Sequence, residues 1–215
     1  MELRDELPYA AEVKRKALHL VALVVPLGMY FLGKNLAVAV LVPVAILAVC
    51  ADVLRVRAAW FGRFITRWFS PLMRKSEQPA LGEPVSINGA TWVMVAAALL
   101  SLLFPIRIAV PAFVLFMVGD AAAALVGRRY GRIRWMGGTH TVEGSLAFLV
   151  IGLAVVMYAP GLTLWVGVVG TVVACLAEAM PGPFNDNLRV PLLTAAVIFA
   201  LERFVLGMDV ALFFG

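Results

Sequence analysis

The chain has 215 residues, of which 63% are hydrophobic and 14% are charged, and its formal net charge is +5. Its mean hydropathy is +0.96. Soluble domains carry roughly 25% charged residues, so this composition excludes a water-soluble globule and predicts an integral membrane protein. The positive charge is therefore not evidence of nucleic-acid binding, because basic residues in a membrane protein act first as topology signals at the bilayer surface.

Seven apolar stretches approach the roughly 20 residues that a helix needs to cross about 30 Å of hydrocarbon. Their apolar runs are continuous rather than alternating, which favours helices over the strands of a membrane β-barrel. We expect an all-α membrane helix bundle that forms a single domain over residues 1–215, with seven spanning helices and with six or eight as alternatives. The predicted spans are 17–33, 36–54, 86–104, 107–126, 143–159, 162–180 and 188–206.

Two features argue against a secreted, disulfide-bonded protein. The first apolar run follows a mixed acidic and basic stretch without a small-residue cleavage pattern, so we expect no cleaved signal peptide. Cys50 and Cys175 both lie inside apolar runs, so we expect neither a disulfide framework nor a thiolate metal site.

The link Arg55–Glu83 is the one sizeable polar stretch between spans. In it, aromatic residues such as Trp60 and Trp68 alternate with Arg63 and Arg67. Arg and Trp are residue types that amphipathic helices use at the headgroup layer. The pattern predicts an interfacial helix that serves as a surface anchor.

The basic residues are distributed unevenly between the two ends of the predicted spans. Fifteen Lys and Arg residues fall on the side of the N-terminus, and three fall on the opposite side, namely Lys34, Arg107 and Arg203. Because cytoplasmic loops of membrane proteins are enriched in Lys and Arg, we predict a cytoplasmic N-terminus and an external C-terminus.

Ionisable residues inside hydrocarbon are costly and are functional candidates by default. Most of them lie toward the predicted cytoplasmic face: His19, Asp52, Asp120, His140, Glu143, Glu178 and Asp186. Asp52 is a weaker candidate, because a carboxylate at a helix end can simply pair with Arg55. We expect Glu202, near the opposite face, to pair with the adjacent Arg203.

The predicted helix directions suit a magnesium polyphosphate at the cytoplasmic face. Spans one, three, five and seven begin there, and their unpaired N–H groups and positive dipole ends favour phosphate. Spans two, four and six end there, with Asp52, Asp120 and Glu178 near those ends. Clustered cations, fixed dipoles and carboxylates together supply phosphate clamps and Mg²⁺ ligands.

Local motifs agree with phosphate chemistry. Gly127-Arg128-Arg129-Tyr130-Gly131-Arg132 follows the predicted fourth span, and a segment from Gly137 to Ser145, rich in Gly, Thr and Ser, opens the fifth. Glycines let the backbone approach a ligand, and hydroxyls bond a phosphate or its metal, although glycines four residues apart also occur as packing residues. His140 and Glu143 stand three apart, but no third His or Cys completes a zinc site.

Taken in order, these residues resemble the CTP-dependent polyprenol kinases, a family that includes dolichol kinase, phytol kinase and the fungal type of diacylglycerol kinase. The resemblance covers most of the chain, and the ordered set is specific although its fragments are not. The family usually has a Lys where this chain has His140. The matching features are Arg15-Lys16, His19, Arg74, Glu77, Asn88-Gly89-Ala90-Thr91, Phe104-Pro105, Gly119-Asp120, Gly127, Gly131, Thr141, Glu143-Gly144-Ser145, Glu178, Asp186-Asn187-Leu188 and Pro191.

The resemblance implies transfer of the γ-phosphate of CTP to the hydroxyl of a membrane lipid at the cytoplasmic face. Phosphoryl transfer requires mainly positioning and charge stabilisation. We therefore predict Asp120 and Asp186 as Mg²⁺ ligands, and Glu143 and Glu178 as metal-supporting or base residues, all four being catalytic candidates. The predicted nucleotide- and phosphate-binding residues are Arg15, Lys16, His19, Gly127, Arg128, Arg129, Gly131, His140, Thr141, Gly144, Ser145 and Asn187.

Two other functions remain open from the sequence. Phosphatidate cytidylyltransferases are similar across the Gly-Asp and Glu-Gly-Ser segments, but their later acidic signature differs from the Asp186-Asn187-Leu188 segment found here. A small transporter would also carry acids within the membrane, but along a route through both halves of the bilayer. The lipid alcohol, the choice of CTP over ATP and the oligomeric state are not determined by these residues.

Overall fold

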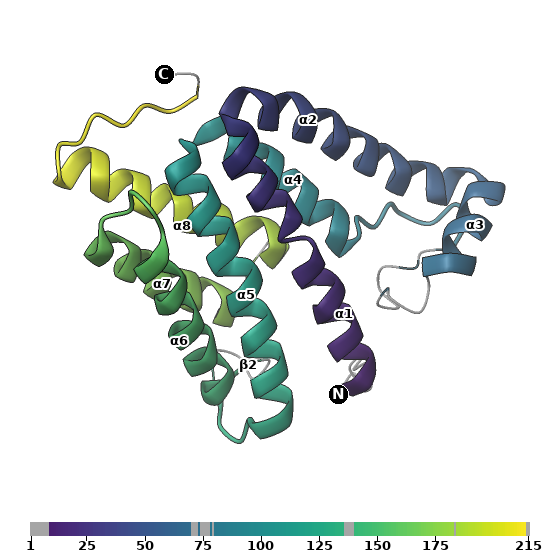
Figure 1. Ribbon diagram of the computed structural model, residues 1–215. Coiled ribbons are helices and arrows are strands. Elements are labelled where there is room, and N and C mark those ends of the chain that lie inside the picture. The colour runs from purple at the N-terminus through teal and green to yellow at the C-terminus, as the bar shows by residue number, and fades with distance from the viewer. Residues whose placement is uncertain are drawn as a thin grey trace.

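The computed structural model describes residues 9–69, 73, 78, 80–135, 140–182 and 184–213. The described chain is mostly helical, which confirms the all-α prediction (Figure 1). Several residues of the sequence motifs lie outside the described residues, namely Arg4, Arg74, Lys75, Glu77, Gly137, Gly138 and Thr139. The elements are α1 (Tyr9–Val21), α2 (Val24–Arg57), α3 (Ala59–Phe69), α4 (Gly89–Leu103), α5 (Ile106–Tyr130), β1 (Arg134–Trp135), β2 (His140–Thr141), α6 (Val142–Tyr158), α7 (Leu164–Ala179), α8 (Asp186–Ala200) and the π-helix η3 (Leu201–Val205).

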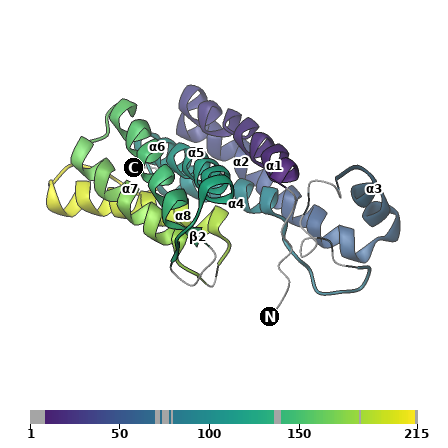
Figure 2. The same ribbon diagram turned by 90° about the horizontal axis from the view of Figure 1, so that it is seen from below.

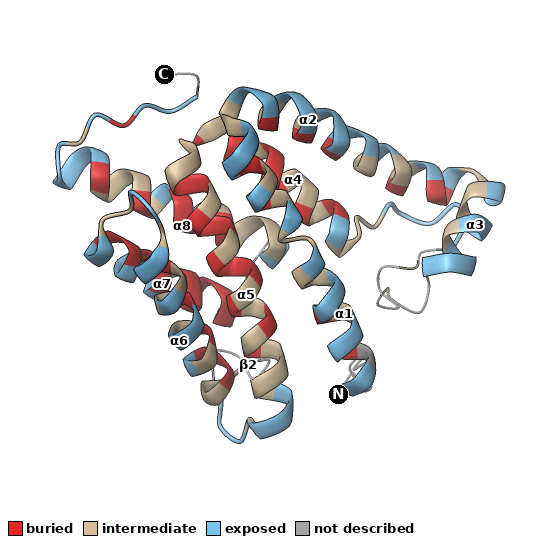
Figure 3. Ribbon diagram, in the orientation of Figure 1, coloured by how far each residue is buried: buried red, intermediate tan, exposed pale blue. Residues whose placement is uncertain are grey.

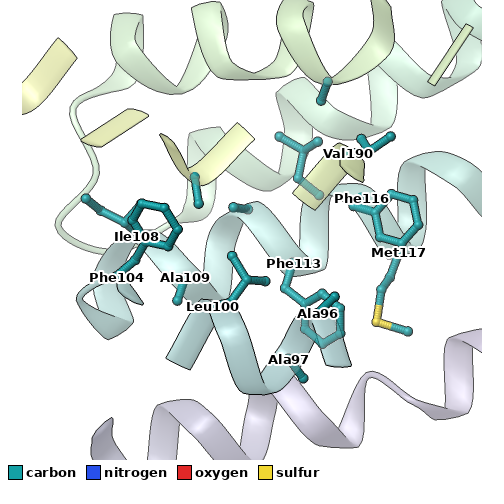
Figure 4. Close-up of a cluster of buried hydrophobic side chains, with 14 of the residues drawn as sticks. Ala96, Ala97, Leu100, Phe104, Ile108, Ala109, Phe113, Phe116, Met117 and Val190 are labelled. Atoms are coloured by element: carbon teal, nitrogen blue, oxygen red, sulfur yellow. The ribbon is translucent and has the colours of Figure 1, made fainter. Parts of the chain in front are cut away.

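Helix α5 is the central element of the bundle. It contacts α1, α2, α4, α6, α7 and α8, and buried residues run along most of its length (Figure 3). The rings of Phe113 and Phe116 are fully buried beside Leu100 of α4 and Val190 of α8 (Figure 4). Because burial of a large apolar side chain contributes about 1.5–3 kcal/mol, this helix organises the packing of the others.

The first two predicted spans are joined by a break at Gly33. Its φ of 74° and ψ of 171° lie outside the helical region, in a conformation that is open almost only to glycine. The chain therefore turns between residues 24–32 and the long remainder of α2 (Figure 1). This break falls at the last residue of the predicted span 17–33, close to the boundary predicted between the first two spans.

The predicted span 17–33 contains a second interruption, which the sequence analysis did not place. Helix α1 ends at Val21 and α2 begins at Val24. Pro26 has no N–H group, so it cannot donate to the carbonyl of Ala22, which accepts instead from the N–H of Val25 at 2.9 Å. The proline thus explains the tighter turn that separates α1 from α2.

The helix predicted in the link Arg55–Glu83 is present as α3. It lies at the end of α2, to one side of the other helices (Figures 1 and 2), and has no buried residue. Trp60 and Trp68 are 65% and 64% exposed. Exposed tryptophans among arginines fit a helix that rests on a headgroup layer.

The described helices fit a membrane protein. The stretch Glu12–Arg57 and helix Ile106–Tyr130 are long and apolar enough to cross a bilayer, and α4, α6 and α7 are shorter apolar helices. Large apolar side chains face outward, among them Phe31, Leu47 and Tyr158, whereas soluble proteins rarely expose extended apolar patches. Seven crossings and the cytoplasmic side of the N-terminus stay predictions.

At the end of the bundle opposite the N-terminus, the expected pairing of Glu202 with Arg203 is wrong. Glu202 lies in η3 with no exposed surface, and its carboxylate is 2.7 Å from the guanidinium of Arg107 at the start of α5. Arg203 instead pairs with Asp209 at 3.1 Å. Adjacent residues on a helix point in different directions, so a buried carboxylate requires a cation from a neighbouring element.

Close packing of α5 against α6 depends on Gly119. A Cβ at this position would lie 2.8–2.9 Å from ring atoms of Phe148, which is fully buried. We predict that Gly119→Ala destabilises the protein by about 1–3 kcal/mol, as overpacking of a core does, measured as a lower unfolding temperature in detergent. Gly28→Ala is the control, because nothing lies within 4 Å of its Cβ position. An equal loss in a Phe148→Leu background would contradict the steric explanation.

Candidate functional site

Lys16 of α1 reaches across to Asp120 of α5. Its Nζ donates to Asp120 Oδ2 at 2.5 Å, and the Nε2 of His19, one turn further along α1, lies 3.5 Å from the same oxygen. The Lys16 side chain is only 4% exposed and that of Asp120 20%. Charges removed from water are stable only when they are paired, so this contact holds α1 against α5.

A second ionic contact joins the same two helices. Glu12 of α1 is 2% exposed; it pairs with Arg15 on its own helix and lies 3.7 Å from the guanidinium of Arg128 on α5. The sequence analysis missed Glu12. The sequence does contain a signal for Glu12, which stands three residues before Arg15 and four before Lys16, because residues at this spacing are neighbours on one helix face.

His140 and Glu178 form a pair between β2 and α7. His140 Nδ1 lies 3.0 Å from Glu178 Oε1. The hydrogen bond to Glu178, with the nearby negative charges of Glu178, Asp186 and Asp120, raises the pKa of His140 above its usual value. A higher pKa enlarges the imidazolium fraction at any given pH, and the acids that raise it come from α5, α7 and α8.

The other carboxylate oxygen of Glu178 is an unusual atom. Glu178 is 5% exposed, and in the part of the chain that the structure describes its Oε2 is buried without a hydrogen-bond partner. Leaving a buried acceptor unsatisfied costs about 1–3 kcal/mol. Such an oxygen is ready to accept a bond from a donor on a bound molecule.

Asp186 is the first residue of α8, and Asn185 caps this helix. The side chain of Asn185 accepts from the N–H of Asn187, and Asp186 Oδ1 pairs with Arg189 at 2.5 Å. Asn187 Nδ2 donates to the carbonyl of Gly89 at 3.0 Å. The start of α8 is thus fixed against the start of α4, and the side chain of Asp186 is half exposed.

Glu143 and Thr141 have structural contacts at the start of α6. Glu143 accepts from the backbone N–H of Arg132 at 3.0 Å and of Ile133 at 3.4 Å, and Thr141 Oγ1 accepts from the N–H of Gly144. These contacts hold the chain that follows α5 against α6. Their catalytic and phosphate-binding roles stay predictions.

The glycines of the two motifs face each other. A Cβ on Gly144 would lie 2.8 Å from the carbonyl oxygen of Ala123 and 3.3 Å from Gly127 Cα, and a Cβ on Gly131 would lie 2.6 Å from Cγ2 of Thr141, the residue that caps α6. The glycines therefore allow α5 and α6 to approach closely, which is the packing alternative left open by the sequence. Ser145 is also engaged, because its Oγ accepts from Trp135 Nε1 at 3.1 Å.

Two predicted residues lie away from this cluster. Arg129 is exposed at the end of α5, against Tyr130. Asp52 pairs with Arg55 at 3.2 Å, as expected, and also accepts from the backbone N–H and the side-chain amide of Asn88. Asp52 therefore fixes the end of α2 to the start of α4, and the sequence analysis missed Asn88 as its partner.

Asp120 and Asp186 fit a Mg²⁺ ion only if a bound ligand supplies the remaining oxygen atoms. Within the described ranges, no group of three or more His, Cys, Asp or Glu side chains is arranged to hold a metal ion. Mg²⁺ in phosphoryl-transfer sites is usually bound by one or two carboxylates plus substrate phosphates. Asp120 and Asp186 supply hard carboxylate oxygens, and each uses one of its two oxygens in the ion pairs described above.

The comparisons with known proteins give one long and one short match. No protein-family model matches the chain, and no solved structure matches it. The chain is 27% identical to an uncharacterized protein of Rickettsia prowazekii over 188 residues, 84% of this chain and 90% of that protein. It is 53% identical to dolichol kinase of Saccharomyces cerevisiae over 38 residues, which span 18% of this chain and 7% of the yeast protein.

The His140–Glu178 pair predicts a pH-dependent contribution to stability. Because the pKa of His140 is raised in the folded protein, its contribution is fully present below the unfolded pKa of about 6.5 and is lost as the pH rises through the higher folded value. His140→Gln removes the charge and keeps a donor. We expect its deficit in unfolding temperature to be largest below about pH 6.5 and to shrink in alkaline buffer. A deficit that does not change with pH would argue against a charged His140.

Proposed function

We propose that this protein is a membrane lipid-alcohol kinase that transfers the γ-phosphate of CTP to the hydroxyl of an isoprenoid alcohol, such as polyprenol, dolichol or phytol, or of diacylglycerol. The observation that carries the proposal is the gathering of Lys16, Asp120, His140, Glu178 and Asp186 from five elements at one end of the bundle. The short match to yeast dolichol kinase supports it.

The charges of this cluster suit a triphosphate. Lys16, with Arg15 and Arg128 nearby, supplies positive charge on α1 and α5. His140 occupies the position where the resembling kinases usually have a Lys. Its raised pKa favours the imidazolium, so the histidine offers the same sign of charge to a phosphate oxygen.

In the proposed reaction the acceptor hydroxyl oxygen attacks the γ-phosphorus. A bond forms between that oxygen and phosphorus, the bond from phosphorus to the β–γ bridging oxygen breaks, and CDP leaves with the bond's electron pair. The hydroxyl proton passes to Glu178, whose Oε2 is a buried acceptor without a partner among the described residues. His140 holds the other oxygen of Glu178 at 3.0 Å and so orients the carboxylate.

Asp120 and Asp186 would hold Mg²⁺ that arrives with the nucleotide. When bound, the metal neutralises charge on the phosphate oxygens. Lys16 orients the Asp120 carboxylate, and Arg189 orients that of Asp186. In this proposal the cluster faces the cytoplasm, and the fifteen basic residues of that side, counted from the sequence, set the orientation of seven spanning helices.

A split-label assay tests the reaction class. Purified protein is incubated with Mg²⁺, a panel of lipid alcohols and phosphatidate, and CTP labelled at either the α- or the γ-phosphate. We expect γ-label in lipid, which also identifies the alcohol. Incorporation of α-label would identify a cytidylyltransferase instead, and transfer of neither label would favour the transporter; a parallel incubation with labelled ATP tests the nucleotide.

We predict that Asp120→Asn abolishes turnover and leaves a folded protein, although one of lower stability because Lys16 loses its partner. The amide keeps the shape of the side chain but removes the charge that Lys16 pairs with and that a metal requires. Asp209→Asn is the matched control, because Asp209 is an exposed carboxylate whose ion pair with Arg203 lies outside the cluster. Wild-type turnover of Asp120→Asn, measured as γ-label in lipid, would remove Asp120 from the mechanism.

A further inference from the structure

An apolar groove of about 330 Å³ lies between α2 and α4. Its volume falls within the range of small-molecule sites, but no polar atom lines it. It opens sideways, because Cys50 and Ile46 on its α2 wall are exposed. The lining residues include Val42, Val49, Cys50, Val95, Leu99 and Leu102.

One end of the groove adjoins a polar cluster. Cys50 stands two residues before Asp52 on α2, about 3 Å along the helix axis, and Asp52 accepts two hydrogen bonds from Asn88 at the start of α4. The next residue, Gly89, accepts from Asn187, which follows Asp186. A chain of direct contacts thus connects the polar end of the groove to the acids at the start of α8.

The shape and chemistry of the groove match one kind of molecule. The groove is apolar along α2 and α4 and polar only beyond one end, and it lies open on the side of the bundle that exposes apolar residues such as Leu47. An amphiphile with a single hydrocarbon tail and a small polar head has the same distribution of polarity. Asp52 and Arg55, the charged residues described at this end, are already paired with each other, so neither is available to an ionic headgroup.

We infer that the groove between α2 and α4 binds the tail of the lipid alcohol, entering from the bilayer, with its hydroxyl directed past Asn88 and Gly89 toward Asp186. The inference rests on the proposed kinase function for the identity of the alcohol, but binding of the tail is measurable without turnover. It assigns tail selectivity to the apolar walls of α2 and α4, whereas the phosphate chemistry belongs to α1, α5, β2, α7 and α8.

Cys50 provides a direct test in the wild-type protein. It is exposed in the groove, whereas Cys175 is buried and donates to the carbonyl of Ser145. The protein in phosphatidylcholine vesicles is treated with an apolar maleimide, with Cys50→Ala to measure background labelling. We expect geranylgeraniol or polyprenol to slow labelling of Cys50 several-fold, and added phosphatidylcholine to leave it unchanged.

Equal protection by phosphatidylcholine would mean that the groove holds bulk lipid. A Cys50–Cys50 cross-link between two copies would mean that the groove is a protein interface. Either result would overturn the inference. Protection by the alcohol without transfer of γ-label would keep the groove and reject the kinase. Transfer of γ-label without protection would keep the kinase and reject the groove.

A pair of tryptophan variants separates the groove from the remaining surface. Leu99→Trp fills the groove, and Leu47→Trp places the same ring on α2 at a residue that is 67% exposed and outside the groove. We expect Leu99→Trp to raise KM for the lipid alcohol roughly tenfold and to leave KM for CTP unchanged, with no change in Leu47→Trp. Equal effects of the two variants would contradict the assignment.

Discussion

A carboxylate inside an apolar bundle requires a cation, and the pairing of Asp120 with Lys16 is the interaction on which the rest of this structure depends. Asp120 lies on α5, the helix that contacts six others, and its partner comes from α1. Removing either partner would leave an uncompensated charge, which typically costs 3–5 kcal/mol. The pair therefore fixes α1 at the polar end of the bundle, where His19 and the Glu12–Arg128 contact also lie.

The polar and apolar parts of the molecule have separate tasks. Charged side chains meet where α7 ends and α8 begins, with Asp120 supplied from the middle of α5, and Phe113 and Phe116 are buried on the same central helix. The backbone contacts of Glu143 and the facing glycines Gly127 and Gly144 keep α5 close to α6. This close packing holds His140, just before α6, within reach of Glu178 on α7, so a histidine in the short strand is positioned by rigid helices.

Much of the architecture follows from the sequence because its causes are local. Continuous apolar runs predict helices, and aromatic residues that alternate with Arg63 and Arg67 predict the helix that the structure contains as α3. The candidate site was predictable as a set, since acids and bases in apolar surroundings are rare. Its pairings were not, because Lys16 with Asp120, His140 with Glu178, and Glu202 with Arg107 join residues far apart in the chain. Such contacts depend on helix rotation and packing, and no local spacing reports them.

The distance along the chain between Lys16 and Asp120, 104 residues, has a consequence for biosynthesis. At about 5–20 residues per second, Lys16 is added to the chain roughly 5–20 s before Asp120. During that interval its ammonium group has no carboxylate from α5 to neutralise it, and water or lipid headgroups must solvate it. Docking of α1 is therefore a late event in the life of the nascent chain, completed only after α5 has been made.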